Sequence, residues 1–246
     1  MERVAAKCRF SLLGTNREVT LLRNIELSEP NIDELPSDEI DRDLKRTFPT
    51  ESWFNEHLRQ IRNVLLWYSW TNPACGYCQS YTYIAFVLYR ILCSKSTRHA
   101  MIDTYYCLHK LNLLVKPLLP KDSKDSKPLG FLCTLKCLIL LEMSQLDRDL
   151  YLHLRKYDIV DIIMMKGLPC LFLNWYTLEE GIDLIDYIVH KQSSIMFKRL
   201  MNFLLAFFVS NREMFLYFSY EKTLEIMDTH MYKKFSSILL LARSLE

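Results

Sequence analysis

The sequence predicts an all-α protein built from many packed helices, and three observations lead to this prediction. Apolar residues recur at helical spacing through most of the chain, which is the periodicity of amphipathic helices. Glycine is scarce, with 5 among 246 residues, and proline totals 8, too few for the many tight turns of an all-β protein. Half of the residues are hydrophobic, so a chain of this length can bury a large core.

Charge and hydropathy exclude several classes of function. The net charge is +2, from 31 basic and 29 acidic residues, so no electrostatic footprint for nucleic acid is present. The first ten residues, MERVAAKCRF, lack the apolar core of a secretory signal. The longest apolar runs, 129–141 and 200–209, fall short of the roughly 20 residues that span a bilayer. We therefore expect a cytoplasmic protein with no transmembrane segment and no nucleic-acid partner.

A short helix is predicted from Ser37 to just before Pro49. The Ser37 hydroxyl can accept a hydrogen bond from an unpaired amide at the helix N-terminus. Asp38 and Glu39 then fall in the first turn, where carboxylates suit the positive end of the helix dipole. Pro49 ends the helix, and we expect extended geometry for Phe48, which precedes it.

Arg46 lies near the C-terminus of this predicted helix, next to an abrupt change of chain direction. Asp43 stands three residues earlier, so its carboxylate can hold the guanidinium group in one direction. Ile40 is the apolar anchor one turn before Asp43. Taken alone, this pattern also fits an ordinary surface helix with one ion pair, and that alternative stays open.

A longer helix is predicted over residues 51–70, followed by a break and another helix. Asn72-Pro73 and Gly76 form the break. Tyr77 and Gln79 lie at the start of the next helix, where backbone amides are free and polar side chains can project. Taken singly, Tyr77 also fits a core aromatic residue, and Gln79 also fits a solvated residue of the first turn.

The remaining helices are predicted from their apolar stripes. Short helices are expected around 4–13 and 17–26. The polar stretch Lys121 to Pro128 is typical of a surface loop, or of a boundary between two helical lobes. Residues 129–143 form a strongly apolar helix that we expect to be central. The others are expected at 98–115, 146–156, 158–166, around 182–189, across 203–215 and at 230–244.

Eight cysteines raise an alternative in which the chain is a helical metal-binding protein. Cys75-x-x-Cys78 has the spacing of zinc or redox sites, and Cys133-x-x-x-Cys137 is the available second pair. That second pair lies in an apolar helical run, where both thiols are more simply small core residues. No histidine pair lies near them in the sequence. We therefore expect free thiols and no metal site.

Two of these stretches together resemble the TBC domain, the GTPase-activating module for Rab-type small GTPases. The first is Ile40-x-x-Asp43-x-x-Arg46 followed by Thr-Phe-Pro, and the second is Gly76-Tyr77-x-Gln79 after Asn72-Pro73. They occur in the family's order and at a plausible separation. Residues 171–188 look like a later segment of the family, with Ile185-Asp186 where a Trp-Asp pair is usual.

The resemblance implies an all-α TBC-type fold in two packed helical lobes. It assigns residues 36–246 to the TBC domain and leaves residues 1–35 as a short N-terminal segment, a reduced first part of the domain. The implied partner is a GTP-bound Rab-family GTPase in vesicle traffic. Peripheral recruitment to endomembranes then remains open, although no basic run marks a membrane anchor.

The resemblance also implies a mechanism with two fingers, one arginine and one glutamine. Arg46 would neutralise charge on the transferring phosphoryl group, and Gln79 would orient the attacking water. Asp43 would orient Arg46, and Tyr77 would contact the GTPase; Ile40 and Gly76 complete the motifs. GTP and magnesium would arrive with the partner, so the chain is an activator that needs no cofactor of its own.

Two departures from the family favour an alternative function, a module that binds a GTPase without accelerating hydrolysis. Ser80-Tyr81 replaces the usual Gly-Met after the glutamine, and we expect it to be bulkier beside the finger. Only residues 1–35 precede the first motif, where family members have several helices. Neither departure touches Arg46 or Gln79, so catalytic assistance is the preferred interpretation.

Overall fold

The computed structural model describes residues 1–14, 36–49, 51–73, 75–93, 97–115, 128–157, 159–228 and 235–246. Throughout these ranges the regular secondary structure is helical, and no strand occurs in them. The all-α prediction is therefore confirmed. The expected helix at 17–26, most of the polar stretch 121–128 and residues 230–234 lie outside the described residues.

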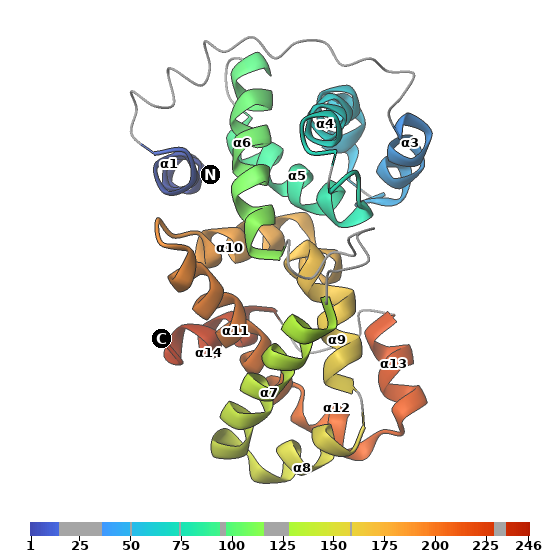
Figure 1. Ribbon diagram of the computed structural model, residues 1–246, viewed down its shortest axis with the longest axis vertical. Helices are drawn as coiled ribbons and strands as arrows, with labels where there is room; N and C mark the ends of the chain where they lie inside the picture. Colours follow the sequence, from blue (N-terminus) through green and yellow to red (C-terminus); the bar gives the residue numbers. More distant parts are fainter. Residues whose placement is uncertain are drawn as a thin grey trace.

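The molecule is elongated, with one group of helices above and another below α10 in Figure 1. The upper group surrounds α5, which contacts α3, α4, α6 and α10. Its elements are α1 (Glu2–Cys8), the π-helix η1 (Arg9–Leu13), α3 (Ser37–Arg46), α4 (Ser52–Thr71), α5 (Gln79–Leu92) and α6 (Thr97–Val115). Because α5 is apolar on nearly all sides, it is buried along its length and forms the centre of this half.

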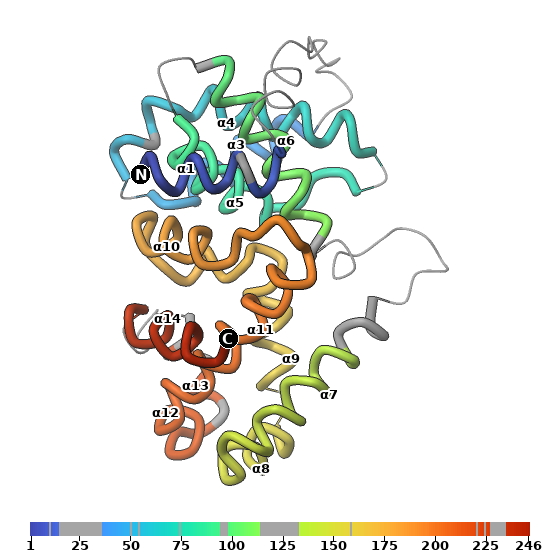
Figure 2. Tube along the Cα trace, turned by 90° about the vertical axis from the view of Figure 1, so that its left-hand side faces the viewer, coloured from blue at the N-terminus to red at the C-terminus, as the bar shows by residue number. Residues whose placement is uncertain are grey.

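The lower group forms the second half of the molecule, and α10 (Leu178–Ile188) lies between the two halves (Figures 1 and 2). Its elements are α7 (Pro128–Leu146), α8 (Arg148–Lys156), α9 (Ile159–Gly167), α11 (Ser193–Ser210), α12 (Arg212–Tyr217), α13 (Tyr220–Asp228) and α14 (Phe235–Ser244). The short 3₁₀ turns η4 (Leu168–Cys170) and η5 (Leu173–Trp175) lead from α9 into α10. Two packed helical lobes are thus the observed architecture.

Helix α11 is the core of the lower half. It is the one helix of the described chain that is long and apolar enough to cross a membrane, but 56% of it is buried within the protein. Three of its phenylalanines, Phe203, Phe207 and Phe208, are fully buried. The prediction of a buried helix here is confirmed, and so is the buried stripe of α14, which consists of Phe235, Ile238, Leu239 and Ala242.

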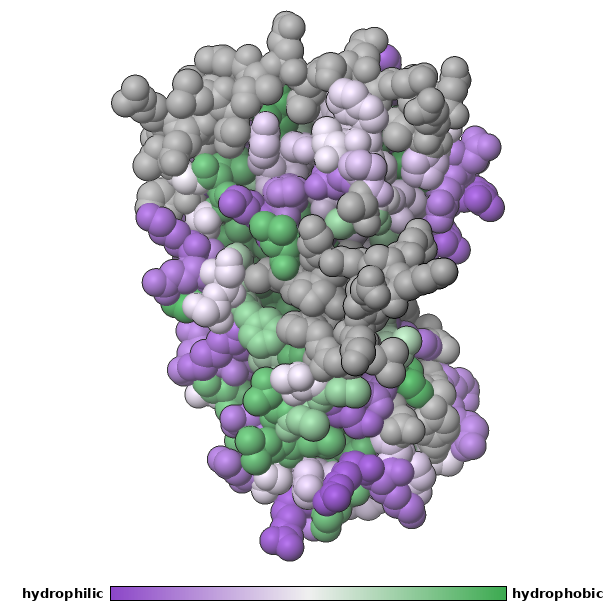
Figure 3. Space-filling view, viewed as in Figure 1, coloured by the Kyte–Doolittle hydropathy of each residue, from purple (hydrophilic) through white to green (hydrophobic). Residues whose placement is uncertain are grey.

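Helix α7 is not central, and that prediction was wrong. Figure 2 shows it running along one edge of the lower half. Leu135, Ile139 and Met143 are buried, whereas Cys133 and Cys137 are exposed rather than core residues. Figure 3 shows hydrophobic surface gathered over the lower half of the molecule, where Figure 1 places α7. The apolar periodicity was right, but it could not tell which side of the helix has neighbours.

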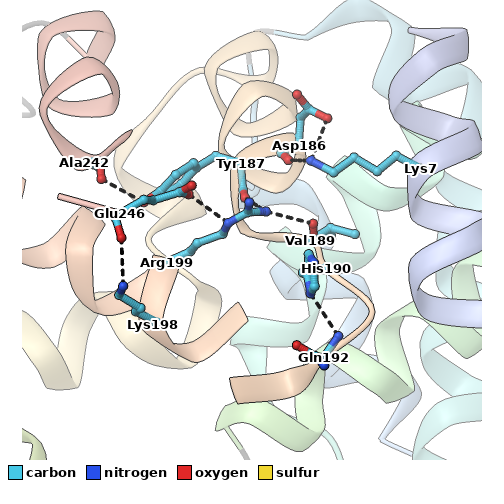
Figure 4. A network of polar contacts seen from close by, with 10 residues as sticks. All are labelled: Lys7, Asp186, Tyr187, Val189, His190, Gln192, Lys198, Arg199, Ala242 and Glu246. Atoms are coloured by element: carbon cyan, nitrogen blue, oxygen red, sulfur yellow. Dashed lines mark hydrogen bonds and ion pairs between the residues drawn. The ribbon is translucent and has the colours of Figure 1, made fainter. Parts of the chain in front are cut away.

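Helix α1 is joined to α10 by charged contacts, which Figure 4 shows in part. Lys7 donates to the Asp186 carbonyl oxygen and pairs with its carboxylate at 3.2 Å, and Arg3 pairs with the same carboxylate at 3.3 Å. Asp186 belongs to the Ile185-Asp186 pair, and Ile185 is fully buried. One face of α10 therefore holds α1, while the division of the chain at residue 35 stays a prediction.

Gly167 is expected to be intolerant of a side chain. A Cβ atom there would lie 2.2 Å from Phe172 Cδ1 and 3.0 Å from Trp175 Cη2, so the aromatic cluster would have to move. We expect Gly167→Ala to lower the free energy of unfolding by about 1–3 kcal/mol. Gly181→Ala is the control, because its Cβ would meet only side-chain methyl groups at 3.2 Å or more. Helix propensity also favours alanine within α10.

Denaturant unfolding of the three proteins measures this difference. The expected order of stability is wild type close to Gly181→Ala, with Gly167→Ala clearly below both. Equal stability of the two variants would show that the Phe172 ring moves aside at no cost.

Candidate functional site

The site is built at the C-terminal end of α3. The helix begins at Ser37, but Pro36 is the capping residue and no side chain caps the helix, so the predicted role of Ser37 as cap was wrong. Asp38 and Glu39 do lie in the first turn. Beyond the last turn, the Thr47 hydroxyl donates to the Asp43 carbonyl oxygen at 2.8 Å.

Phe48 turns the chain sharply after α3. Its φ is 46°, in the left-handed region, so the expected extended geometry before Pro49 was wrong. A phenylalanine rarely adopts such a φ without compensation from packing. The ring provides it, with edge contacts to Tyr83 and Phe86 of α5 at centroid distances of 5.6 Å. Packing of the Phe48 ring against α5 thus holds this turn in place.

Arg46 presents its guanidinium group to solvent from this end of α3. Its side chain is 61% exposed, yet it pairs with Asp43 Oδ1 at 2.5 Å. The Asp43 side chain is only 4% exposed, and Ile40, one turn earlier, is fully buried. An exposed cation is therefore directed by a buried carboxylate, as the i, i+3 spacing predicted.

The second oxygen of Asp43 connects α3 to the segment between α4 and α5. The Tyr77 hydroxyl donates to Asp43 Oδ2 at 2.8 Å and lies 2.8 Å from Thr82 Oγ1. Because that phenol has given its only proton to Asp43, the Thr82 hydroxyl must donate to it. A phenol is already protonated at neutral pH, and burial raises the pKa of Tyr77 further, so its hydroxyl remains a donor.

The segment from Asn72 to Cys78 holds Tyr77 and leads into Gln79. The Asn72 carbonyl oxygen accepts from the Cys75 and Gly76 amides at 2.9 Å, which closes a turn. Gly76 has a φ of 59°, a conformation that glycine adopts without steric cost. Cys78 then caps α5 in extended geometry, and Gln79 is its first, half-exposed residue. The predicted break and helix start are both present.

Tyr81 does not crowd Gln79, contrary to the sequence-based expectation. Its side chain is 1% exposed and packs against Tyr68 with a centroid distance of 5.1 Å. Ser80 is also buried, and its hydroxyl donates to Cys78 Sγ at 3.1 Å. The first turn of α5 directs both residues inward, so the bulk lies in the core.

The structure therefore links Arg46, Asp43 and Tyr77 through hydrogen bonds and ion pairs. Gly76 and Gln79 flank Tyr77 along the chain, and Ile40 fixes α3 to the core. Sequence reasoning missed Thr82, which is fully buried and holds the Tyr77 hydroxyl. A polar residue within an otherwise apolar helical stripe was the available signal.

The eight cysteines are spread over several elements of the structure. All eight are free thiols, and Cys75 and Cys78 are half-buried. In the described ranges no group of three or more histidine, cysteine or acidic residues is placed to hold a metal ion.

Removing the Tyr77 hydroxyl is expected to destabilise the site. Tyr77→Phe leaves a buried carboxylate oxygen of Asp43 without its donor, so we expect a loss of about 1–3 kcal/mol in the free energy of unfolding. The matched control is Tyr151→Phe, whose hydroxyl accepts from the exposed Arg155 and has no other partner among the described residues. There we expect a change within about 0.5 kcal/mol. Denaturant unfolding tests both, and similar losses would argue against a structural role for the Asp43–Tyr77 bond.

Comparison with known proteins places the chain in a family. The family model described as the Rab-GTPase-TBC domain matches residues 14–217. TBC1 domain family member 2B of Xenopus tropicalis is 26% identical over 167 residues, which cover 66% of this chain and 16% of that protein. The human protein of the same name is 28% identical over 166 residues, 66% of this chain and 15% of that protein.

The chain thus spans 16% or less of the length of these relatives. The crystal structure of the Ypt/Rab-GAP domain of Gyp1p has the same fold, with a TM-score of 0.69 at 14% identity, over 98% of this chain and 79% of that one. The match of the family model over most of the chain decides its membership. The chain belongs to the Rab-GTPase-TBC domain family.

Proposed function

We propose that this chain accelerates GTP hydrolysis by a GTP-bound Rab-family GTPase, with Arg46 and Gln79 as its two fingers. The observation that carries the proposal is the exposed Arg46 held by the buried Asp43, which also holds Tyr77 two residues before Gln79. Membership of the Rab-GTPase-TBC domain family supports the choice of partner. The arginine motif and the glutamine motif are separate in the sequence, but both are connected to the Asp43 carboxylate.

Arg46 is suited to phosphoryl transfer by its chemistry and its exposure. The transition state spreads negative charge over phosphate oxygens, so catalysis depends on positioning and charge stabilisation. A guanidinium group stays charged at all relevant pH values and matches two oxygens with a planar fork. Asp43 occupies one edge of that fork and leaves the other donors to solvent or to a partner.

Gln79 would orient the attacking water in this proposal. Its amide offers both a donor and an acceptor, which is what a water molecule needs to be held for in-line attack. Its position at the first turn of α5, an otherwise buried helix, fixes its backbone. GTP and magnesium would come bound to the partner, and the chain would act as an activator without a substrate site of its own.

The proposed setting is the cytoplasm, with recruitment to the endomembranes on which Rab GTPases direct vesicle traffic. The alternative is a module that binds a GTPase without accelerating hydrolysis. The burial of Ser80 and Tyr81 removes one argument for that alternative, because neither side chain projects beside Gln79.

Single-turnover hydrolysis distinguishes the two functions. A panel of GTP-loaded Rab GTPases is mixed with the chain, phosphate release is followed, and binding to each GTPase is measured in parallel. Acceleration of one or a few GTPases supports the proposal. Binding to a GTP-loaded member without acceleration of any would favour the non-catalytic module.

A further inference from the structure

Helix α7 carries apolar side chains on two opposite faces. Leu135, Ile139 and Met143 face the protein and are at most 1% exposed. Leu141 points away from them and is 56% exposed, whereas Leu138, on the flank of the helix, is 45% exposed. Exposed leucines that are neighbours on one helix surface form the kind of apolar patch that marks an interaction site. The outer face of α7 therefore has the character of an interface rather than of an ordinary solvated surface.

A groove of about 470 Å³ lies beside this outer face, between α7 and α11. Its apolar lining consists of Leu138, Leu146, Phe197, Met201, Leu205 and Leu245. Figure 3 shows the hydrophobic surface of this half. Leu141, three residues after the groove-lining Leu138 on the same helix, adds exposed apolar surface beside the groove. The groove can hold several large aliphatic side chains.

One acidic and one basic side chain stand on the two walls of the groove. Glu142 is on α7 and Lys198 is on α11, and both are exposed. Lys198 donates to the Glu246 carbonyl oxygen at 2.9 Å (Figure 4). Neither Glu142 nor Lys198 forms an ion pair within the described part of the chain. The Lys198 ammonium keeps two further N–H donors, so both charged groups can still meet a partner that carries one charge of each sign.

We propose that this face binds a second copy of the chain in a two-fold dimer. A two-fold interface brings the same patch of both copies together, so Glu142 of each copy meets Lys198 of the other. The patch is complementary to itself in charge, which favours this occupant over one with a single sign. The outward leucines of each α7 would fill the groove of the opposite copy.

The dimer leaves the proposed fingers accessible. Helices α3 and α5 lie in the upper half of Figure 1, whereas α7 lies in the lower half. The inference is therefore independent of the proposed function, and either can fail without the other.

Analytical ultracentrifugation over a range of concentrations tests the dimer. We expect a concentration-dependent dimer for the wild type and at least about a hundredfold weaker dimerisation for Leu141→Glu, because a carboxylate would be buried unpaired at the interface. Leu240→Glu is the matched control, since Leu240 is 72% exposed on α14 and does not line the groove. Circular dichroism verifies that both variants are folded.

Charge reversal tests the pairing across the two-fold axis. Glu142→Lys and Lys198→Glu are each expected to weaken the dimer, because each places like charges together. The double variant is expected to restore it, since both pairs are then reversed. The inference is overturned if the wild type stays monomeric at all concentrations. It is overturned equally if Leu141→Glu and Leu240→Glu behave alike, or if the double reversal gives no recovery.

Discussion

Arg46→Ala is expected to lower the stimulated rate of GTP hydrolysis about 10³- to 10⁵-fold, which is the effect of removing an arginine finger. This corresponds to roughly 4–7 kcal/mol of transition-state stabilisation. The substitution removes the exposed guanidinium group and leaves Asp43 bonded to Tyr77, so the site should keep its fold. Single-turnover hydrolysis by the responsive GTPase measures the loss, and binding of the GTP-loaded partner should persist.

Two companion variants separate the loss of the arginine finger from the loss of one positive charge on α3. Arg46→Lys keeps a cation but loses the planar fork, so we expect most of the loss to remain. Arg42→Ala removes an exposed arginine of the same helix, whose Nε atom donates to the Asp38 carbonyl oxygen at 3.2 Å. We expect that variant to behave like the wild type. Full activity of Arg46→Ala, or equal losses at the two positions, would contradict the assignment of the finger.

Gln79→Ala is expected to lower the stimulated rate about 10²- to 10³-fold, because a water that is no longer oriented attacks from many directions. Gln79 begins α5 and is half-exposed, so its removal should leave the fold intact. The effect should fall on the rate of hydrolysis rather than on the affinity for the GTPase. The same single-turnover assay separates these quantities through its dependence on the concentration of the chain.

Gln79→Glu sharpens this test. The side chain keeps its shape, but its carboxylate cannot donate a hydrogen bond and is repelled by the phosphates, so the loss should be at least as large. Gln192→Ala, at an exposed position before α11, is the control and should be silent. If Gln79→Ala weakened binding in proportion to the rate, the residue would be a contact residue rather than the one that orients water.

Local spacing predicted much of the site, whereas contacts distant in sequence could not be predicted from it. The Asp43–Arg46 pair follows from helix geometry, and both are where the sequence placed them. The Asp43–Tyr77 bond joins residues 34 apart, so only the fold reveals it. The geometry of Phe48 was missed because ring packing against α5 outweighed the local preference before a proline.

The position of α7 shows another limit of sequence patterns. Its run of apolar residues predicts a helix, and the helix is present. The same run predicts a helix with neighbours on every side. In one copy of the chain, however, Leu138 and Leu141 remain exposed. Periodicity describes what a helix can bury but does not identify the neighbour that buries it.

The Asp43–Arg46 contact also bears on the entropy of association. Holding a long arginine side chain in one conformation costs about 2 kcal/mol of rotamer entropy. Asp43 is itself immobilised, with 4% of its side chain exposed and its second oxygen bonded to Tyr77. Much of the freedom of Arg46 is therefore lost when the chain folds. A partner that meets this surface finds the guanidinium group already restricted, and less of its binding energy is used to order it.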